Sequence, residues 1–270
     1  MIIKNILINT IQKRNFLVMV KKVFKRFEID SSIEANKWAN DNSISLDEYC
    51  NKINPRIWKE SIKACNQIEL QGVKTLDGNT SETMYPDNAI SHSLGGGGAY
   101  PLIYFHCRII KPKIVVETGV AAGWSSFAIL ESLRINGQGK LYSSDFPYFR
   151  LKNPEQFIGY VVPESIRNNW YLDIRGDGIA IPEICNKVQN IDIFHYDSDK
   201  SYSGRLFAIK QIQKKLSLNS IVIFDDIQDN LFFKNLVKYL NCEYQVFAFE
   251  GKFVGQLKGF NITNQKNINI

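Results

Sequence analysis

The 270-residue sequence has few cysteines, and none of them are paired in a recognisable motif. The five are odd in number, lie far apart and form no CxxC pair, which argues against a disulfide framework and against a zinc site. Free thiols in a reducing compartment fit this pattern, so we expect a cytoplasmic protein. The cysteines are Cys50, Cys65, Cys107, Cys185 and Cys242.

Long apolar runs are also missing. No stretch approaches the ~20 apolar residues of a membrane-spanning helix, and the run from Phe16 to Val20 is too short for the core of a signal peptide. No basic-aromatic RNA-binding motif occurs either, so we expect no nucleic-acid partner. A composition of 44% hydrophobic and 22% charged residues is that of an ordinary globular protein, long enough for one α/β domain and an extension.

Positive charge is concentrated near the N-terminus. Residues 1–30 hold seven basic and two acidic residues, so they carry +5 of the net charge of +6. Apolar residues recur at helical spacing from Phe16 to Phe27 with basic residues between them, which predicts a basic amphipathic helix. We expect its apolar face to pack on its own domain or on a second subunit of a homo-oligomer. Peripheral contact with a membrane surface is the alternative.

The region that follows has helical patterning and then becomes irregular. A helix start is expected at Ser45, Pro55 interrupts or restarts the helix, and apolar residues share one face from Trp58 to Leu70. The glycine-rich stretch 72–98 predicts a long loop. This loop is either a lid, with His92 as a substrate contact, or a flexible linker.

We therefore divide the chain into two parts. Residues 1–98 form an N-terminal extension with the basic helix, a helical cap and the glycine-rich loop. Residues 99–270 form the main domain.

The most informative stretch is I-V-V-E-T-G-V-A-A-G-W-S-S at residues 114–126. A buried apolar strand ends in Glu117 and turns through Gly119 and Gly123 into a helix. Such glycines let the backbone approach a ligand, and the helix start offers unpaired N–H groups to a carboxylate or phosphate. A dinucleotide fingerprint needs glycine at its first, third and sixth positions, but Ala121 and a tryptophan occupy the last two.

The pattern E-x-G-x-x-x-G-x-S instead resembles motif I of class I S-adenosylmethionine (SAM) methyltransferases. A strand-to-helix turn without a ligand is the alternative. The resemblance implies a SAM-binding cradle made by Glu117, Gly119, Ala121, Gly123 and Ser125.

Strand and helix patterns alternate from residue 114 onward, which predicts a doubly wound α/β fold with a mostly parallel sheet. Strands are expected at 114–117, 140–144, 170–174, 191–196 and 220–224, and helices at 125–135, 182–189, 204–215 and 230–240. The last strands, 244–249 and 252–257, flank Glu250-Gly251 and predict an antiparallel hairpin. This arrangement resembles the seven-stranded, Rossmann-like methyltransferase sheet.

Ligands of such sheets bind beyond the carboxyl ends of the strands, and two acids follow the second and third strands. Asp145 lies 22 residues beyond Gly123, where a carboxylate accepts both ribose hydroxyls of an adenosine. Asp177 lies in a turn that, in the resembled fold, is beside the adenine. A turn-forming role is the alternative for Asp145.

Three more carboxylates follow the next two strands. Asp197 ends the fourth strand and Asp225 and Asp226 end the fifth, so we expect them to converge and repel one another. Hard oxygen ligands without nearby histidine or cysteine favour a divalent cation, Mg²⁺ first. The alternative is that the Asp225-Asp226 pair caps the next helix and Asp197 pairs with Lys200.

The D-x-x-K and D-D motifs resemble those of metal-dependent O-methyltransferases, both the catechol type and the macrocin-type sugar branch, over residues 99–258. The resemblance implies Mg²⁺ bound by Asp197, Asp225 and Asp226, and it makes Lys200, three residues after the ligand Asp197, the catalytic base. Sugar-modifying relatives more often carry histidine at the position of Lys200. We expect a SAM-dependent O-methyltransferase whose acceptor is a hydroxyl of a sugar, a glycan precursor or another small metabolite.

Two other classes remain open at this stage. A dinucleotide-dependent oxidoreductase also places an acid after its second strand. A non-catalytic binding module on the same fold is the third reading.

Overall fold

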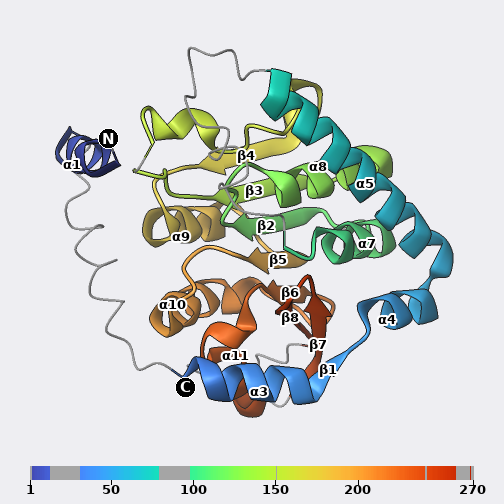
Figure 1. Ribbon diagram of the computed structural model, residues 1–270. Helices are drawn as coiled ribbons and strands as arrows, with labels where there is room; N and C mark the ends of the chain where they lie inside the picture. Colours follow the sequence, from blue (N-terminus) through green and yellow to red (C-terminus); the bar gives the residue numbers. More distant parts are fainter. Residues whose placement is uncertain are drawn as a thin grey trace.

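A computed structural model describes residues 2–12, 31–78, 98–149, 151–240, 242–259 and 268 (Figure 1). The basic helix expected at 16–27 and the proposed substrate contact His92 lie outside the described residues.

An eight-stranded sheet forms the centre of the molecule, with the order β1-β7-β8-β6-β5-β2-β3-β4. Among the described strands, β8 alone runs antiparallel to its neighbours β6 and β7. The predicted α/β fold with a parallel sheet and a C-terminal hairpin is confirmed. The strands are β1 Ser43–Ile44, β2 Ile114–Thr118, β3 Lys140–Ser144, β4 Trp170–Asp173, β5 Ile193–Tyr196, β6 Ile221–Phe224, β7 Glu243–Phe249 and β8 Lys252–Lys258.

Helices cover both faces of this sheet, as Figure 1 shows. Helices α5, α7 and α8 share one hydrophobic cluster with the sheet, and α9, α10, α11 and part of α3 share the other. The described α-helices are α1 Ile2–Gln12, α3 Ser32–Asn42, α4 Leu46–Ile53, α5 Pro55–Gly78, α7 Tyr100–Ile110, α8 Trp124–Asn136, α9 Asp177–Lys187, α10 Tyr202–Ile212 and α11 Phe232–Leu240. Short 3-10 helices occur at Pro154–Phe157, Glu164–Asn169, Gln213–Lys215 and Ile227–Asp229.

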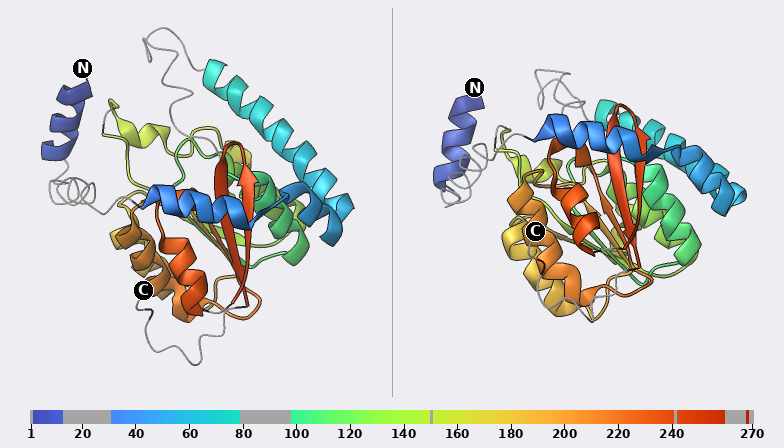
Figure 2. Two further views of the ribbon diagram at one scale, coloured as in Figure 1. Left: turned by 60° about the horizontal axis from the view of Figure 1, so that its bottom comes forward. Right: turned by 90° about the horizontal axis from the view of Figure 1, so that it is seen from below.

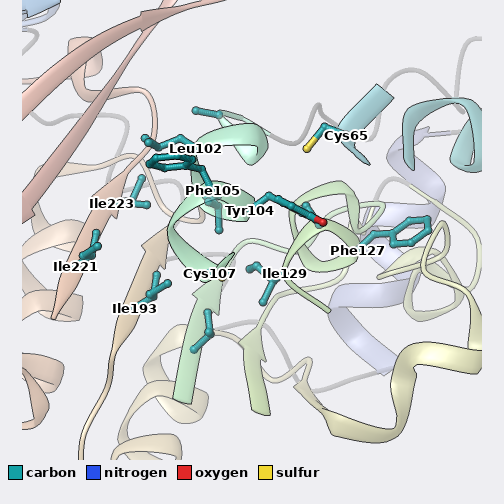
Figure 3. Close-up of a cluster of buried hydrophobic side chains, with 14 of the residues drawn as sticks. Cys65, Leu102, Tyr104, Phe105, Cys107, Phe127, Ile129, Ile193, Ile221 and Ile223 are labelled. Carbon is teal, nitrogen blue, oxygen red and sulfur yellow. The ribbon is translucent and has the colours of Figure 1, made fainter. Parts of the chain in front are cut away.

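The core follows from strands that are apolar on both faces. Along β2, Val115 enters the cluster under α7 and α8, whereas Val116 enters the opposite cluster. Figure 3 shows the first cluster, where side chains of α7 such as Phe105 lie over the isoleucines of β5 and β6. The five cysteines are free thiols, as expected.

The N-terminal extension packs into this same core. Trp58 and Cys65 belong to the cluster under α7 and α8. Helix α3 lies along the β7–β8 hairpin (Figure 2), and its Trp38 stacks on Tyr244. Ser43 of β1 pairs with Val246 of β7 in parallel register. None of the described helices is long and apolar enough to cross a membrane. The functional division at residue 98 stays a prediction.

Three element predictions were wrong in detail. The sheet has eight strands rather than seven, because the two residues of β1 are too few to give a periodic pattern. Helix α5 continues to Gly78, so the loop does not begin at 72; Gly72 lies inside the helix, where a Cβ would be 2.2 Å from the Trp124 ring. Helix α9 begins at Asp177, five residues before the expected start, with Pro182 in its interior.

Candidate functional site

The turn between β2 and α8 is shaped by two glycines that approach backbone from other segments. At Gly119, with φ +80°, a Cβ would lie 2.3 Å from the carbonyl oxygen of Asp197. At Gly123, with φ +103°, a Cβ would lie 2.8 Å from the Cα of Gly159. The first glycine therefore joins the predicted cofactor cradle directly to the end of β5.

Glu117 lies beneath this turn and is fully buried. Its two carboxylate oxygens accept hydrogen bonds from the hydroxyls of Ser125 and Ser126, each at 2.5 Å, and from Ser143 at 2.9 Å. The Nδ1 atom of His195 is 3.7 Å from Glu117 Oε1. Glu117 and Ser125 thus bond to each other, and Glu117 supports the cradle from inside the sheet.

Asp145 lies against the cradle, as the sequence predicted. Its Oδ2 accepts a hydrogen bond of 2.7 Å from the backbone N–H of Ala121, and its Oδ1 accepts one of 2.6 Å from Phe146. Burial raises the pKa of Asp145 to about 6, against the lowering effect of these two N–H donors. Each oxygen retains a second lone pair for a hydroxyl donor.

Asp177 begins α9 and connects the ends of two strands. Its Oδ1 accepts a hydrogen bond of 2.7 Å from the hydroxyl of Ser144, and its Oδ2 accepts one from Ser198. Residues after β3 and β5 are therefore held to the start of α9. The structure brings Asp145 and Asp177 to the same edge of the sheet, because Asp177 accepts its hydrogen bond from Ser144, the residue before Asp145.

The three acids proposed as metal ligands do converge. Asp197, Asp225 and Asp226 offer carboxylate oxygens that all lie within 4.8 Å of one another. The Nζ of Lys200 forms an ion pair with Asp197 and is 3.0 Å from Asp226 Oδ2 and 3.7 Å from Asp225 Oδ2. Lys252, which the sequence did not indicate, lies 3.0 Å from Asp226 Oδ1.

These charges shift one another's protonation. Burial raises the pKa of Asp197 to about 7, although Lys200 opposes that shift. Burial lowers the pKa of Lys200, but the three carboxylates outweigh burial and hold it above its usual value. For Asp226 burial raises the pKa, yet the two lysines hold it below its usual value. The acids thus stabilise the positive charges of Lys200 and Lys252.

One carboxylate oxygen of the cluster is free to coordinate a cation. Asp225 Oδ1 is buried and accepts no hydrogen bond from any described residue. A buried carboxylate oxygen without a donor is costly unless a charge or water satisfies it. The donor set of three carboxylates therefore fits a hard divalent cation.

Arg205 supports this cluster through hydrogen bonds to its backbone. Its side chain is fully buried and donates to the carbonyl oxygen of Asp226 at 2.7 Å, to that of Asp225 at 3.2 Å and to Asn230 Oδ1 at 3.2 Å. Asn230 in turn donates to the carbonyl oxygen of Lys200 at 2.8 Å. One buried guanidinium thus ties together the two turns that carry the acids and the lysine.

The end of the glycine-rich stretch also reaches the cluster. A Cβ at Gly98, with φ +56°, would lie 3.1 Å from the carboxylate of Asp225. The chain therefore enters α7 directly beside the acids. Residues 79–97 lie outside the described residues, so the two expected roles of this stretch, a lid and a flexible linker, both stay predictions.

The arrangement defines a class of protein. A glycine turn and acid-lined strand ends face one edge of a parallel sheet, and an antiparallel β8 lies between β6 and β7. This is the Rossmann-like architecture of methyltransferases.

The sequence comparison agrees. Residues 116–227 match the family described as a methyltransferase domain, and this span holds the cradle, Asp145 and the acid cluster. The predicted enzyme class, a methyltransferase, is thereby confirmed. No curated protein matches the chain.

Solved structures share the fold. The O-methyltransferase TomG from Streptomyces achromogenes, in complex with SAM, is similar over 67% of this chain and 94% of its own, with 13% sequence identity and a TM-score of 0.51. A methyltransferase from Podospora anserina, bound to S-adenosylhomocysteine, is similar over 84% of this chain and 94% of its own, with 14% identity and a TM-score of 0.49. The likeness to TomG shows a common fold.

Proposed function

We propose that the protein transfers a methyl group from SAM to a hydroxyl oxygen of a small acceptor, with the help of a divalent cation. The observation that carries this proposal is the contact between the two halves of the site. The cradle glycine Gly119 packs on the backbone of Asp197, so the expected donor site and the acid cluster adjoin each other. Adjacent donor and acceptor sites are what a transfer reaction needs, because proximity and orientation lower its barrier.

The cradle side would hold SAM. SAM supplies an electrophilic methyl group on a sulfonium. The backbone turn from Gly119 to Gly123 and the start of α8 would face the methionine end, and Asp145 the ribose hydroxyls. Asp177 would lie beside the adenine. Glu117 would act through Ser125 and Ser126, whose hydroxyls it orients.

The acid cluster would hold the cation, with Mg²⁺ the first choice for three carboxylates. Asp197, Asp225 and Asp226 are the ligands, and Asp225 Oδ1 is the oxygen that lacks a donor among the described residues. When bound, such a cation lowers the pKa of a hydroxyl that contacts it. The competing role for these acids is to pair with Lys200 and Lys252 as a surface ion cluster.

Lys200 would accept the proton of the hydroxyl. Its Nζ lies within 4 Å of all three carboxylates, so it faces the place where the hydroxyl would meet the cluster. The same carboxylates keep the ammonium protonated. With Asp197, Asp225 and Asp226 engaged as cation ligands, Lys200 would lose part of this hold and its amine would become a competent base.

The acceptor is a sugar, a glycan precursor or a similar polyol in this proposal, with a catechol as the second choice. Support for the sugar comes from the resemblance to the macrocin-type branch. The lysine in place of the more frequent histidine supports the catechol type.

Titration calorimetry of the full chain with SAM, S-adenosylhomocysteine and NAD, each with and without Mg²⁺, tests the donor site. We expect micromolar binding of SAM and S-adenosylhomocysteine and none of NAD. Absence of binding at millimolar SAM contradicts the cradle assignment.

A methyl-transfer assay over sugar nucleotides, free glycosides and catechols tests the acceptor side. We expect activity to vanish with a chelator and to return with Mg²⁺. Asp225→Asn should raise the Mg²⁺ requirement, whereas Asp229→Asn, an acid on the neighbouring 3-10 helix outside the cluster, should not. Full activity in chelator rejects the metal role.

A further inference from the structure

Helix α1 presents its apolar side to the solvent. Leu7, Ile8 and Ile11 are 56%, 38% and 73% exposed, and together with the exposed Lys4 they follow the i, i+3, i+4, i+7 spacing of a single helix face. We name these four residues the outer stripe. A surface helix normally turns such a stripe toward the core, so its outward position indicates a partner.

The opposite side of α1 is fixed to the protein by a polar contact. The side chain of Asn9 is buried, and its Nδ2 donates to the carbonyl oxygens of Phe149 and Leu151, each at 2.9 Å. These bonds orient the helix, because rotation that buried the outer stripe would break both of them. Figures 1 and 2 show α1 at the edge of the molecule, clear of the other described helices.

The charge of the sequence that contains α1 indicates the kind of partner. Residues 1–30 carry +5, and the other 240 residues together carry only +1. A second copy of the chain brings the same positive charge to the contact and has no strongly acidic balance elsewhere to offset it. An anionic lipid surface supplies the opposite charge and accepts aliphatic side chains at the same time.

We propose that α1 docks the protein on an anionic membrane surface, with the three aliphatic residues of the outer stripe inserted among the lipids and Lys4 near the headgroups. This inference goes beyond the proposed methyl transfer and does not depend on it. Asn9 keeps the stripe facing outward in solution, so no rearrangement of α1 is needed before docking.

Flotation of the full chain with vesicles tests the proposal. One set of vesicles contains phosphatidylcholine alone, and the other contains about one-quarter phosphatidylglycerol. We expect partitioning onto the anionic vesicles at least about tenfold above that onto neutral ones, and a loss of binding as NaCl rises from about 50 to about 300 mM.

A matched pair of variants separates the outer stripe from general surface apolarity. Leu7→Ser with Ile8→Ser and Ile11→Ser should lower partitioning about tenfold or more. The control replaces three exposed aliphatic residues elsewhere, Ile33→Ser with Ile135→Ser and Leu218→Ser, and should leave it unchanged. Circular dichroism and the melting temperature show that both proteins fold.

Two kinds of result overturn the proposal. One is wild-type protein that stays off anionic vesicles at low salt, or stripe variants that bind them as well as wild type. The other is a dimer, seen by light scattering, that the three stripe substitutions convert to a monomer while vesicles remain unbound. That outcome assigns the stripe to a second copy.

Discussion

The Nη2 of Arg205 donates to the backbone carbonyl oxygen of Asp226 at 2.7 Å from inside the protein. Asp226 itself adopts the left-handed conformation with φ +50°, which a residue other than glycine seldom does without support. The second bond of the guanidinium, to the carbonyl oxygen of Asp225, secures the preceding residue. The orientation of both carboxylates therefore depends on Arg205, which is not itself part of the cluster.

Replacing Arg205 with methionine tests this dependence. We expect the affinity of the cluster for Mn²⁺ or Mg²⁺ to fall by about 10- to 100-fold, the usual effect of losing a residue that orients metal ligands. Unfolding free energy should fall by about 1 to 3 kcal/mol, because two buried carbonyl groups lose their donor. Metal-binding calorimetry and urea unfolding measure the two effects. Arg134→Met, on the exposed end of α8, is the control, and an unchanged metal affinity in Arg205→Met contradicts the prediction.

Three glycine-to-alanine substitutions should change the stability of the protein by different amounts. Gly119→Ala brings a Cβ to 2.3 Å from backbone at Asp197, so it should be the most destabilising and should also displace that ligand. Gly137→Ala has positive φ but open space, so it should cost about 1 to 2 kcal/mol from conformation alone. Gly178→Ala, inside α9 with no close neighbour, should be neutral or stabilising. Melting temperatures give the order, and a Gly119→Ala protein as stable as Gly137→Ala would disprove the close approach.

SAM binding should depend on pH through Asp145. Burial raises the pKa of this carboxyl to about 6, and only its ionised form accepts two ribose hydroxyls. Affinity measured by calorimetry should therefore fall as the pH drops below about 6. Asp145→Ala should weaken binding by about 1.5 to 3 kcal/mol and flatten the profile. Asp173→Asn, an acid paired with Arg175 outside the cradle, serves as control; a flat wild-type profile argues against the ribose role.

The stability of the protein should fall on mild acidification because of His106. The Nε2 of this buried side chain lies 2.5 Å from Gln256 Oε1, and burial lowers its pKa from 6.5 to about 4, although the hydrogen bond opposes the shift. Between these two pH values the unfolded chain takes up a proton that the folded protein does not. His106 therefore makes its full contribution to the free energy of unfolding above about pH 6.5. This contribution falls as the pH drops toward 4, by up to about 3 kcal/mol.

Urea unfolding at about pH 7.5 and about pH 4.5 measures this decline. In His106→Gln the difference between the two pH values should shrink by about 2 kcal/mol, since glutamine does not titrate. Equal differences in the two proteins would exclude His106 as the source.

Lys200→Ala should lower kcat by about 10²- to 10⁴-fold while SAM affinity stays nearly unchanged, as expected for a lost proton acceptor. Lys210→Ala, at an exposed position later on α10, should be silent. A Lys200→Ala enzyme with normal kcat across the pH range would reduce this lysine to an ion-pair partner of Asp197.

The sequence predicted the strand ends well because each is marked by an apolar run followed by an acid. Asp145, Asp197 and Asp225 all lie where that pattern places them, and the parallel sheet brings them to one edge. Lys252 was missed, although the strand pattern could have predicted its position. It begins the strand that runs antiparallel to β6, so it must start where β6 ends, beside Asp226.

Other parts of the site had no pattern to reveal them. Arg205 follows the helix start of α10, where an arginine normally reaches solvent, and only tertiary packing buries it. Of the three serines that bond to Glu117, only Ser125 belonged to the recognised pattern; Ser126 lies inside α8 and Ser143 inside β3, where no motif marks them. The outer stripe of α1 was missed because the sequence analysis placed the N-terminal helix at 16–27, and helical spacing in any case tells which residues share a face and not which way that face points.

The pairing of β1 with β7 has a consequence for the order of assembly. Ser43 and its partner Val246 are separated by about 200 positions, so β1 leaves the ribosome long before the strand it joins. Helix α3 shares this delay, since it lies against the hairpin and the 3-10 helix that follows β6. Helix α3 and strand β1 are therefore made early but reach their final positions late. In a nascent chain that stops before the hairpin, neither has its packing partner.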